Sequence, residues 1–246
     1  MKKNFKKLNK LQKAILITLC ALSMLTAVSL IYLSDSYPCD EEAISEFSYG
    51  LSAEAREVEK GIFAFGEENA KTGFIFYPGG KVDHRAYEPL MLACAEKGML
   101  CVLVKMPFNM AFFDSNAADG IYTLFPNVES WYVGGHSLGG SMACSYAAKN
   151  VDKLEGIILL GSYSVNDLSK SELRVLTVIA SEDKVVGDDY KKYRNMLPEV
   201  TEEAKLIGGC HAGFGMYGAQ KGDGIPTLTS TEQIRQTAEI IADFLK

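Results

Sequence analysis

A serine flanked by glycines in the middle of the chain restricts its fold more than any other feature. Residues 135–139 read Gly-His-Ser-Leu-Gly, after a short apolar run at 131–133 and before helical spacing at 138–149. This order is typical of a strand that turns sharply into a helix and exposes the turn residue. Gly135 and Gly139 supply the small residues that such a turn needs where strand and helix nearly touch. A plain glycine-rich loop is the alternative, and the flanking strand and helix disfavour it.

Strands and helices alternate along the rest of the chain. This alternation predicts an α/β fold, in which right-handed crossovers place helices on both faces of one mostly parallel sheet. Residues 54–65 could add one or two initial strands, and 161–173 is too short to hold a helical lid, so we expect no large lid domain. Apolar runs predict strands at 74–77, 100–104, 131–133, 156–160, 175–179 and 203–207, and helical spacing marks 85–96, 138–149 and 231–245.

The N-terminus has the pattern of a membrane anchor. Residues 14–33 carry no charge, and twenty apolar residues are enough to span a bilayer. We expect a lysine-rich cytoplasmic tip and transmembrane signal anchor at 1–34, a polar tether at 35–52 and the folded domain at 53–246, outside the cytoplasm by the positive-inside rule. A cleaved secretory signal, which would release the domain, and a lipoprotein signal at Cys20 are the alternatives. The lysines before the apolar run are Lys2, Lys3, Lys6, Lys7, Lys10 and Lys13.

Charge and cysteine content exclude several kinds of partner. Six of the 25 basic residues precede the apolar run, which leaves 19 against 31 acidic residues in the remainder. Such an acidic surface repels phosphate backbones, so we expect no nucleic-acid partner. Five cysteines lie outside the apolar run, without Cys-x-x-Cys spacing. We therefore expect no metal site and no cofactor, and a disulfide at Cys39 or Cys210 stays open.

A serine nucleophile needs a base, and the chain has three histidines. His136 adjoins Ser137, and the turn points neighbouring side chains apart, so we expect it to pack the turn. His84 opens a predicted helix, where a solvated or helix-terminal role is the simpler interpretation. His211 follows the last predicted strand in the glycine-rich stretch 208–215. The sequence therefore predicts His211 as the general base.

The base needs a carboxylate that holds its other ring nitrogen. Asp183 follows the predicted strand at 175–179 and gives the chain order serine, aspartate, histidine. Glu182 and Asp188 are the alternatives, the first as a solvated neighbour and the second as the start of a helix.

An oxyanion formed at the serine would need two backbone amides. The amide of Leu138, directly after the serine, is one candidate. Residues 78–81 read Pro-Gly-Gly-Lys after the strand at 74–77, and glycines let the backbone approach a substrate closely. We expect the Gly80 amide to be the second donor, with the Lys81 amide as the next choice and a simple turn as the alternative.

These motifs together resemble the α/β-hydrolase superfamily over about residues 73–246. The motifs are Gly-His-Ser-Leu-Gly-Gly, Tyr-Pro-Gly-Gly, Ser-Glu-Asp after a strand and Gly-x-His-x-x-Phe after the last strand. Residues 77–83, 105–109 and 211–215 are similar to a compact, often membrane-anchored bacterial group related to dienelactone hydrolases. The resemblance implies an α/β-hydrolase fold and hydrolysis of esters or lactones. Dienelactone hydrolases proper use a cysteine nucleophile, so their substrate is not carried over.

The expected activity is that of a serine hydrolase. Ser137 would attack a small ester, lactone or related acyl substrate, His211 would take its proton, and water would later release the acyl group. Thioester or amide cleavage would use the same residues. The expected partners are this small-molecule substrate and, through the N-terminal helix, the membrane. Residues 106–113 and 214–223 are candidate walls of an apolar acyl pocket. The alternative from another class is a catalytically inactive binding protein of the cell envelope with the same fold.

Overall fold

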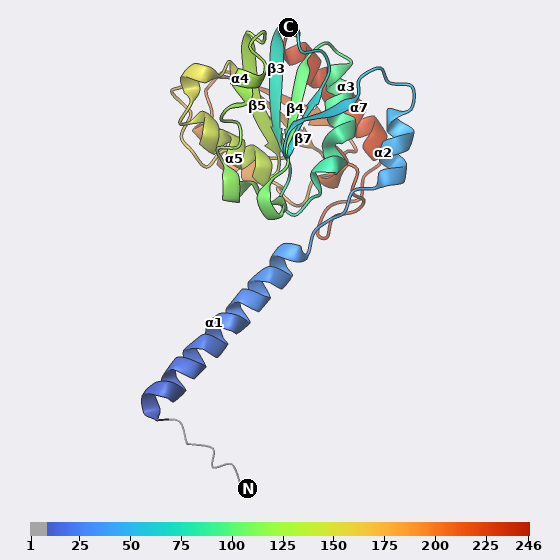
Figure 1. Ribbon diagram of the computed structural model, residues 1–246. Helices are drawn as coiled ribbons and strands as arrows, with labels where there is room; N and C mark the ends of the chain where they lie inside the picture. The colour runs from blue at the N-terminus through green and yellow to red at the C-terminus, as the bar shows by residue number, and fades with distance from the viewer. Residues whose placement is uncertain (1–8) are drawn as a thin grey trace. The chain divides into compact units, whose positions relative to one another are not determined.

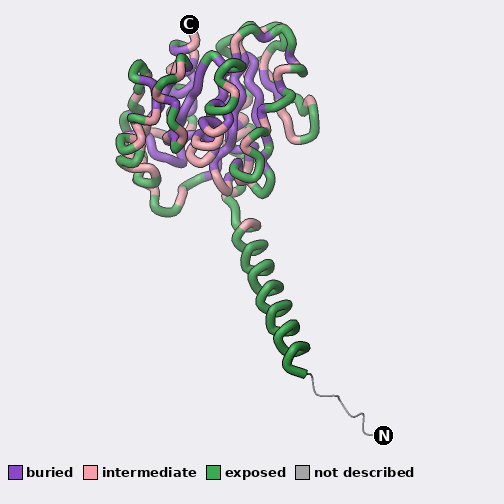
Figure 2. Tube along the Cα trace, turned by 90° about the vertical axis from the view of Figure 1, so that its left-hand side faces the viewer, coloured by how far each residue is buried: buried purple, intermediate pink, exposed green. Residues whose placement is uncertain are grey.

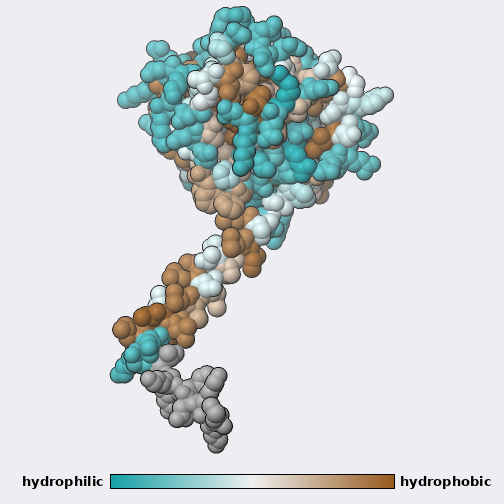
Figure 3. Space-filling model, in the orientation of Figure 1, coloured by the Kyte–Doolittle hydropathy of each residue, from teal (hydrophilic) through white to brown (hydrophobic). Residues whose placement is uncertain are grey.

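The computed structural model describes residues 9–246, which divide into two compact units with the boundary in the chain between Ser36 and Tyr37. The first unit contains α1 (Lys10–Ser34), 25 residues long and apolar enough to cross a membrane. The side chain of Asn9 caps its first turn, and apolar side chains are exposed along its length (Figures 2 and 3). A helix that is apolar all round and covered by no other element of its unit is suited to lipid. Most of the predicted lysine-rich tip lies outside the described residues.

The second unit is built on an eight-stranded sheet in the order β1-β2-β4-β3-β5-β6-β7-β8. The pairs β1-β2 and β2-β4 are antiparallel, and all other pairs are parallel. Among the strands labelled in Figure 1, β3 lies beside β5 and β4. This confirms the predicted α/β fold and both strands within 54–65. The strands are β1 (Ala55–Glu59), β2 (Ile62–Phe65), β3 (Thr72–Tyr77), β4 (Leu100–Val104), β5 (Ser130–His136), β6 (Gly156–Leu160), β7 (Arg174–Ala180) and β8 (Thr201–Leu206).

Helices cover both faces of the sheet because its central strands are apolar on both sides. Every residue of β4 and β6 is buried. On one face, α3 (Glu88–Ala95) and α7 (Ser230–Phe244) pack into one core cluster. On the other face, α4 (Ile121–Leu124) and α5 (Leu138–Ala147) pack into a second cluster. No helix forms within the described residues 161–173, which confirms the absence of a large lid.

The segment expected to be a tether contains a short helix. Asp40 caps α2 (Glu41–Ser48), and Phe47 from this helix is 4% exposed in the same core cluster as α3 and α7. The single apolar stripe of α2 is too short to stand out among its polar residues. The other short helices are η1 (His84–Tyr87), η2 (Pro107–Asn109), η3 (Ala111–Asp114), η4 (Val151–Lys153), α6 (Asp189–Lys192), η5 (Arg194–Met196) and η6 (Ala212–Phe214).

Parallel pairing brings the carboxyl ends of six strands, β3 to β8, to one edge of the sheet. Residues at or next to the ends of neighbouring strands pair with one another, as in Tyr77 with Gly135 and Ala180 with Leu206. Loops that begin at this edge are where open α/β sheets bind ligands. The residues predicted to carry chemistry all lie in these loops.

Candidate active site

Ser137 occupies a strained turn between β5 and α5. Its φ and ψ are 52° and −125°, a region that side-chain-bearing residues rarely adopt. A Cβ atom on Gly135 or Gly139 would lie 2.3 or 2.1 Å from the carbonyl oxygen of Tyr77. Strand, helix and the end of β3 are therefore in direct contact, and only glycine fits at both positions.

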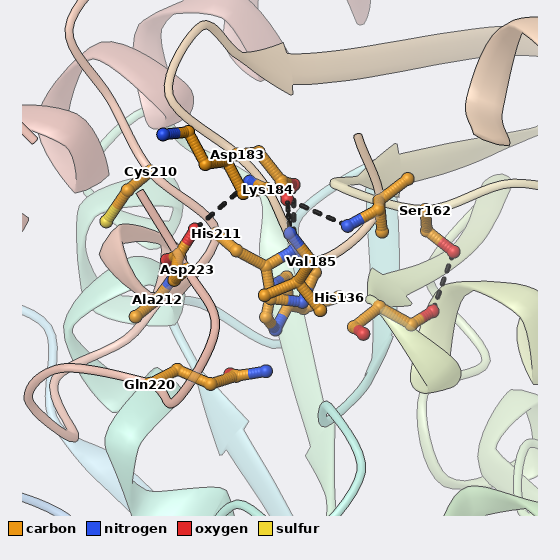
Figure 4. Close-up of polar contacts among 12 residues, drawn as sticks. His136, Ser162, Asp183, Lys184, Val185, Cys210, His211, Ala212, Gln220 and Asp223 are labelled. Atoms are coloured by element: carbon orange, nitrogen blue, oxygen red, sulfur yellow. Dashed lines mark hydrogen bonds and ion pairs between the residues drawn. The ribbon is translucent and has the colours of Figure 1, made fainter. Parts of the chain in front are cut away.

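Hydrogen bonds fix the backbone of this turn. The amide of Ser137 donates to the carbonyl oxygen of Leu160 at 3.0 Å, and its own carbonyl oxygen accepts from Ser141 N at 3.2 Å. The same carbonyl oxygen accepts from Ser162 Oγ at 2.6 Å (Figure 4). Because β6 and the loop after it hold both sides of the turn, the position of Ser137 is set by the rigid sheet.

His211 and Asp183 form a buried pair. His211 Nδ1 lies 2.8 Å from Asp183 Oδ2, and the two side chains are 1% and 6% exposed. Asp183 Oδ1 accepts the amides of Val185 and Val186, both at 2.9 Å. Because the carboxylate accepts a hydrogen bond from Nδ1–H, Nε2 of the neutral ring is left as an acceptor. The structure thus joins the histidine and the aspartate that the sequence singled out.

The space for this pair depends on Gly161, which the sequence did not single out. Its φ is +47°, and a Cβ atom there would lie 3.0 Å from Asp183 Oδ2 and 3.1 Å from His211 Nδ1. The two other carboxylates considered for this role are engaged elsewhere. Glu182 accepts from the hydroxyl of Ser181, and Asp188 pairs with Lys191 on the surface.

In the loop after β3, only one of the backbone amides of residues 79–81 donates no hydrogen bond within the described residues. Gly79 N donates to Tyr87 Oη at 3.1 Å, and Lys81 N donates to the carbonyl oxygen of Asn109 at 2.7 Å. Within residues 9–246, neither the Gly80 nor the Leu138 amide donates a hydrogen bond. Gly80 also packs on Leu138, because a Cβ atom there would lie 3.0 Å from Leu138 Cδ2. The contacts therefore favour Gly80 over Lys81 as an oxyanion donor.

His136 lies buried beside His211, with 4.3 Å between the ring centroids. Its Nδ1 is 2.8 Å from Tyr87 Oη, and the same hydroxyl oxygen accepts from Gly79 N, so His136 and Tyr87 share a buried hydrogen bond. Burial, together with the neighbouring His211, holds the pKa of His136 well below its usual value. His84 lies elsewhere, 3.2 Å from Asp83 Oδ1 and beside the ring of Phe63.

Asp223 makes contacts next to the site that the sequence did not reveal. Its Oδ2 accepts from Ala212 N at 2.8 Å, and its Oδ1 accepts from Lys184 N at 3.4 Å (Figure 4). One carboxylate therefore ties together the backbones next to His211 and Asp183. Burial alone would raise the pKa of Asp223, but its hydrogen bonds from backbone amides outweigh burial and lower it. In the sequence this aspartate stands in a glycine-rich stretch and resembles an ordinary turn residue.

The sequence profile of the alpha/beta hydrolase family matches residues 73–235, more than half of the chain. The chain belongs to the alpha/beta hydrolase family. No curated protein matches the sequence. The profile covers the strained serine turn and the Asp183–His211 pair, and family and fold together support a hydrolase.

Solved structures of low sequence identity share the fold of this alpha/beta hydrolase. A CIB-like hydrolase from Thermoplasma acidophilum is 15% identical with a TM-score of 0.56, over 80% of this chain and 99% of its own. A dienelactone hydrolase from Anabaena variabilis is 12% identical with a TM-score of 0.58, over 79% and 96%. A membrane phospholipase A, described as a bacterial virulence factor, is 13% identical with a TM-score of 0.56, over 95% and 98%. These likenesses confirm the fold.

Proposed function

We propose that the protein is a serine hydrolase that cleaves a small ester, lactone or related acyl substrate through an acyl-enzyme. The observation that carries the proposal is the strained Ser137 at the start of α5, at the same sheet edge as the buried hydrogen bond between His211 and Asp183. A dienelactone hydrolase and a membrane phospholipase A share the fold, which supports an acyl substrate for this chain.

In the proposed mechanism, Ser137 Oγ forms a bond to the substrate carbonyl carbon while His211 Nε2 takes the hydroxyl proton. Asp183 keeps the imidazole in the required tautomer and stabilises the imidazolium. The carbon–oxygen bond to the leaving group then breaks, and His211 returns the proton to that oxygen. In deacylation, water attacks the acyl-enzyme in the same way, with His211 as base and then acid, which releases the carboxylic acid and restores the serine.

The amides of Gly80 and Leu138 would hold the negative oxygen of the tetrahedral intermediate. Both lie beside the serine turn, and neither donates elsewhere within residues 9–246. Leu138 is the first residue of α5, where the helix dipole favours negative charge. Each such donor contributes roughly 10²–10³ in kcat in serine hydrolases.

We also propose that α1 stays attached as a signal anchor, with the hydrolase domain outside the cytoplasm. The stretch 14–33 of α1, which carries no charge and follows a run of lysines in the sequence, supports this arrangement. Mass spectrometry of the purified chain would test it, because an intact N-terminus is expected and a start after residue 34 would indicate a cleaved signal.

Labelling of the detergent-solubilised full chain with a fluorophosphonate probe, followed by peptide mapping, tests the serine mechanism. We expect an adduct on Ser137 and a loss of at least roughly 10³-fold in turnover of short p-nitrophenyl esters in Ser137→Ala. The half-buried Ser169, changed to Ala, is the matched control and should behave like the wild type. Activity that survives in pure Ser137→Ala would refute the mechanism. A folded protein without an adduct would favour the inactive binding protein.

A further inference from the structure

Three exposed phenylalanines gather in the segment 106–114, which we name the aromatic loop. Phe108, Phe112 and Phe113 are 57%, 49% and 47% exposed. The ring centroids of Phe108 and Phe113 are 5.6 Å apart, and those of Phe112 and Phe113 are 4.1 Å apart. Single exposed apolar residues are ordinary on a protein surface, whereas aromatic rings in contact with one another form a patch that indicates a binding surface.

The backbone of the aromatic loop is strained. Phe108 and Asn109 have φ values of 52° and 54°, and the left-handed region costs a bulky residue such as phenylalanine roughly 1–2 kcal/mol. Phe108 stays exposed in spite of this conformation. Strain at an exposed aromatic side chain is a feature of ligand-binding segments more often than of plain loops.

The aromatic loop borders the proposed oxyanion donor. The carbonyl oxygen of Asn109 accepts from Lys81 N at 2.7 Å, and Met110 Sδ would lie 3.6 Å from a Cβ atom on Gly80. An apolar group bound to the aromatic loop would therefore reach the serine site directly.

The residue that follows the membrane anchor by a short link binds the loop after β3. Only Asp35 and Ser36 separate the end of α1 from Tyr37. Tyr37 N donates to the carbonyl oxygen of Lys81 at 2.7 Å, and its own carbonyl oxygen accepts from Asp83 N at 3.0 Å. Three residues of extended chain span at most about 10 Å. If α1 spans a bilayer, the loop that Tyr37 binds is kept close to the lipid surface.

We propose that the aromatic loop inserts into the bilayer that holds α1 and that the substrate is an acyl ester of a membrane lipid. The proposed insertion is argued from the exposed rings and the short link to α1. The proposed lipid substrate rests, in addition, on the proposed serine hydrolase function. Phenylalanine side chains enter the boundary between headgroups and acyl chains. The residues after the apolar run are acidic, 31 against 19 basic, so insertion depends on apolar contact and suits zwitterionic rather than anionic lipid.

Tryptophan fluorescence tests insertion without any need for turnover. The full chain is reconstituted into phosphatidylcholine vesicles, with or without bromine on the acyl chains, as Phe112→Trp and as the control Val200→Trp. Val200 is 86% exposed and precedes β8, at the opposite end of the strands from the site. The native Trp131 is 6% exposed and gives a constant background.

Brominated lipid should quench the added emission of Phe112→Trp roughly twofold or more, because bromine acts only on contact with inserted rings. It should leave that of Val200→Trp unchanged. Equal emission of Phe112→Trp in both lipids would overturn the insertion.

Turnover in the same vesicles tests the substrate class. A fluorogenic phosphatidylcholine in the bilayer and p-nitrophenyl butyrate in water are compared in the wild type, in the double variant Phe112→Ser with Phe113→Ser, and in Val200→Ser. The double variant should lower the ratio of lipid to soluble ester turnover by about tenfold, since each lost ring removes apolar contact with lipid. Val200→Ser should keep the wild-type ratio.

An unchanged ratio in the double variant, or a wild type that cleaves only the soluble ester, would refute the lipid substrate and leave the serine mechanism standing. A wild type that cleaves neither ester would refute the proposed function, while the quenching result would still decide insertion.

Discussion

Two strained turns lie at the same edge of this hydrolase, and they are held in opposite ways. The serine turn places Ser137 at a φ of 52° between glycines that touch the backbone of β3. The aromatic loop places Phe108 at the same φ with its side chain more than half exposed. The first strain is imposed by close packing and the second by hydrogen bonds such as that from Lys81 to Asn109. Added atoms should therefore damage the serine turn and be tolerated by the loop.

The largest expected effect is that of one methyl group in the serine turn. In Gly139→Ala the new Cβ atom would lie 2.1 Å from the carbonyl oxygen of Tyr77, a backbone atom that cannot move aside. We expect a loss of about 3 kcal/mol in the free energy of unfolding and loss of turnover. Urea denaturation and ester assays measure the two quantities.

Gly80→Ala, in the loop after β3, is the matched control for Gly139→Ala. Its Cβ atom would meet the flexible side chain of Leu138 at 3.0 Å, so the stability should change by less than about 1 kcal/mol. Equal stability losses in Gly80→Ala and Gly139→Ala would show that close packing does not distinguish the serine turn.

A smaller gain should follow from removing the side chain that bears the strain. Ser137→Gly replaces a residue in a rare conformation by one that adopts it freely, so we expect the free energy of unfolding to rise by about 1–2 kcal/mol. Ser137→Ala keeps the Cβ atom and should gain much less, and both variants should be inactive. If the two variants are equally stable, the turn stores no strain that glycine relieves.

Sequence reasoning recovers the features that depend on local chemistry and chain order. The serine turn, the strands around it and the pairing of His211 with Asp183 follow from glycine spacing, apolar runs and the position of each residue after a strand. Asp223 was missed, because it lies 40 residues from Asp183 and meets Lys184 only through the folded loops. Tyr87 was missed for the same reason, since its hydroxyl binds His136 across the sheet edge. No local pattern announces the left-handed backbone of Phe108.

The exposed turn should respond more weakly than the serine turn to relief of its strain. Asparagine tolerates left-handed backbone better than phenylalanine, so Phe108→Asn should raise the free energy of unfolding by about 0.5–1 kcal/mol. Chemical denaturation of the detergent-solubilised chain is the measurement, with Phe112→Asn, which has no positive φ to relieve, as the control. A destabilised Phe108→Asn would mean that the ring contributes more by packing than its conformation costs.

The smallest expected effect on stability near neutral pH is that of replacing His136, which lies next to the serine and has no counterpart in the aromatic loop. Burial holds the pKa of His136 below the value of about 6.5 found in unfolded chains. Below about pH 6.5 the unfolded chain then binds more protons than the folded one, so stability falls as the pH falls and recovers as it rises. Burial lowers the pKa of His84 in the same direction, which makes His84→Gln the necessary control. The melting temperature should fall less steeply between pH 8 and pH 5 in His136→Gln, whose side-chain amide can still hydrogen-bond Tyr87. If only His84→Gln makes the melting temperature less dependent on pH, the acid sensitivity comes from His84. Acid then destabilises a region outside both strained turns.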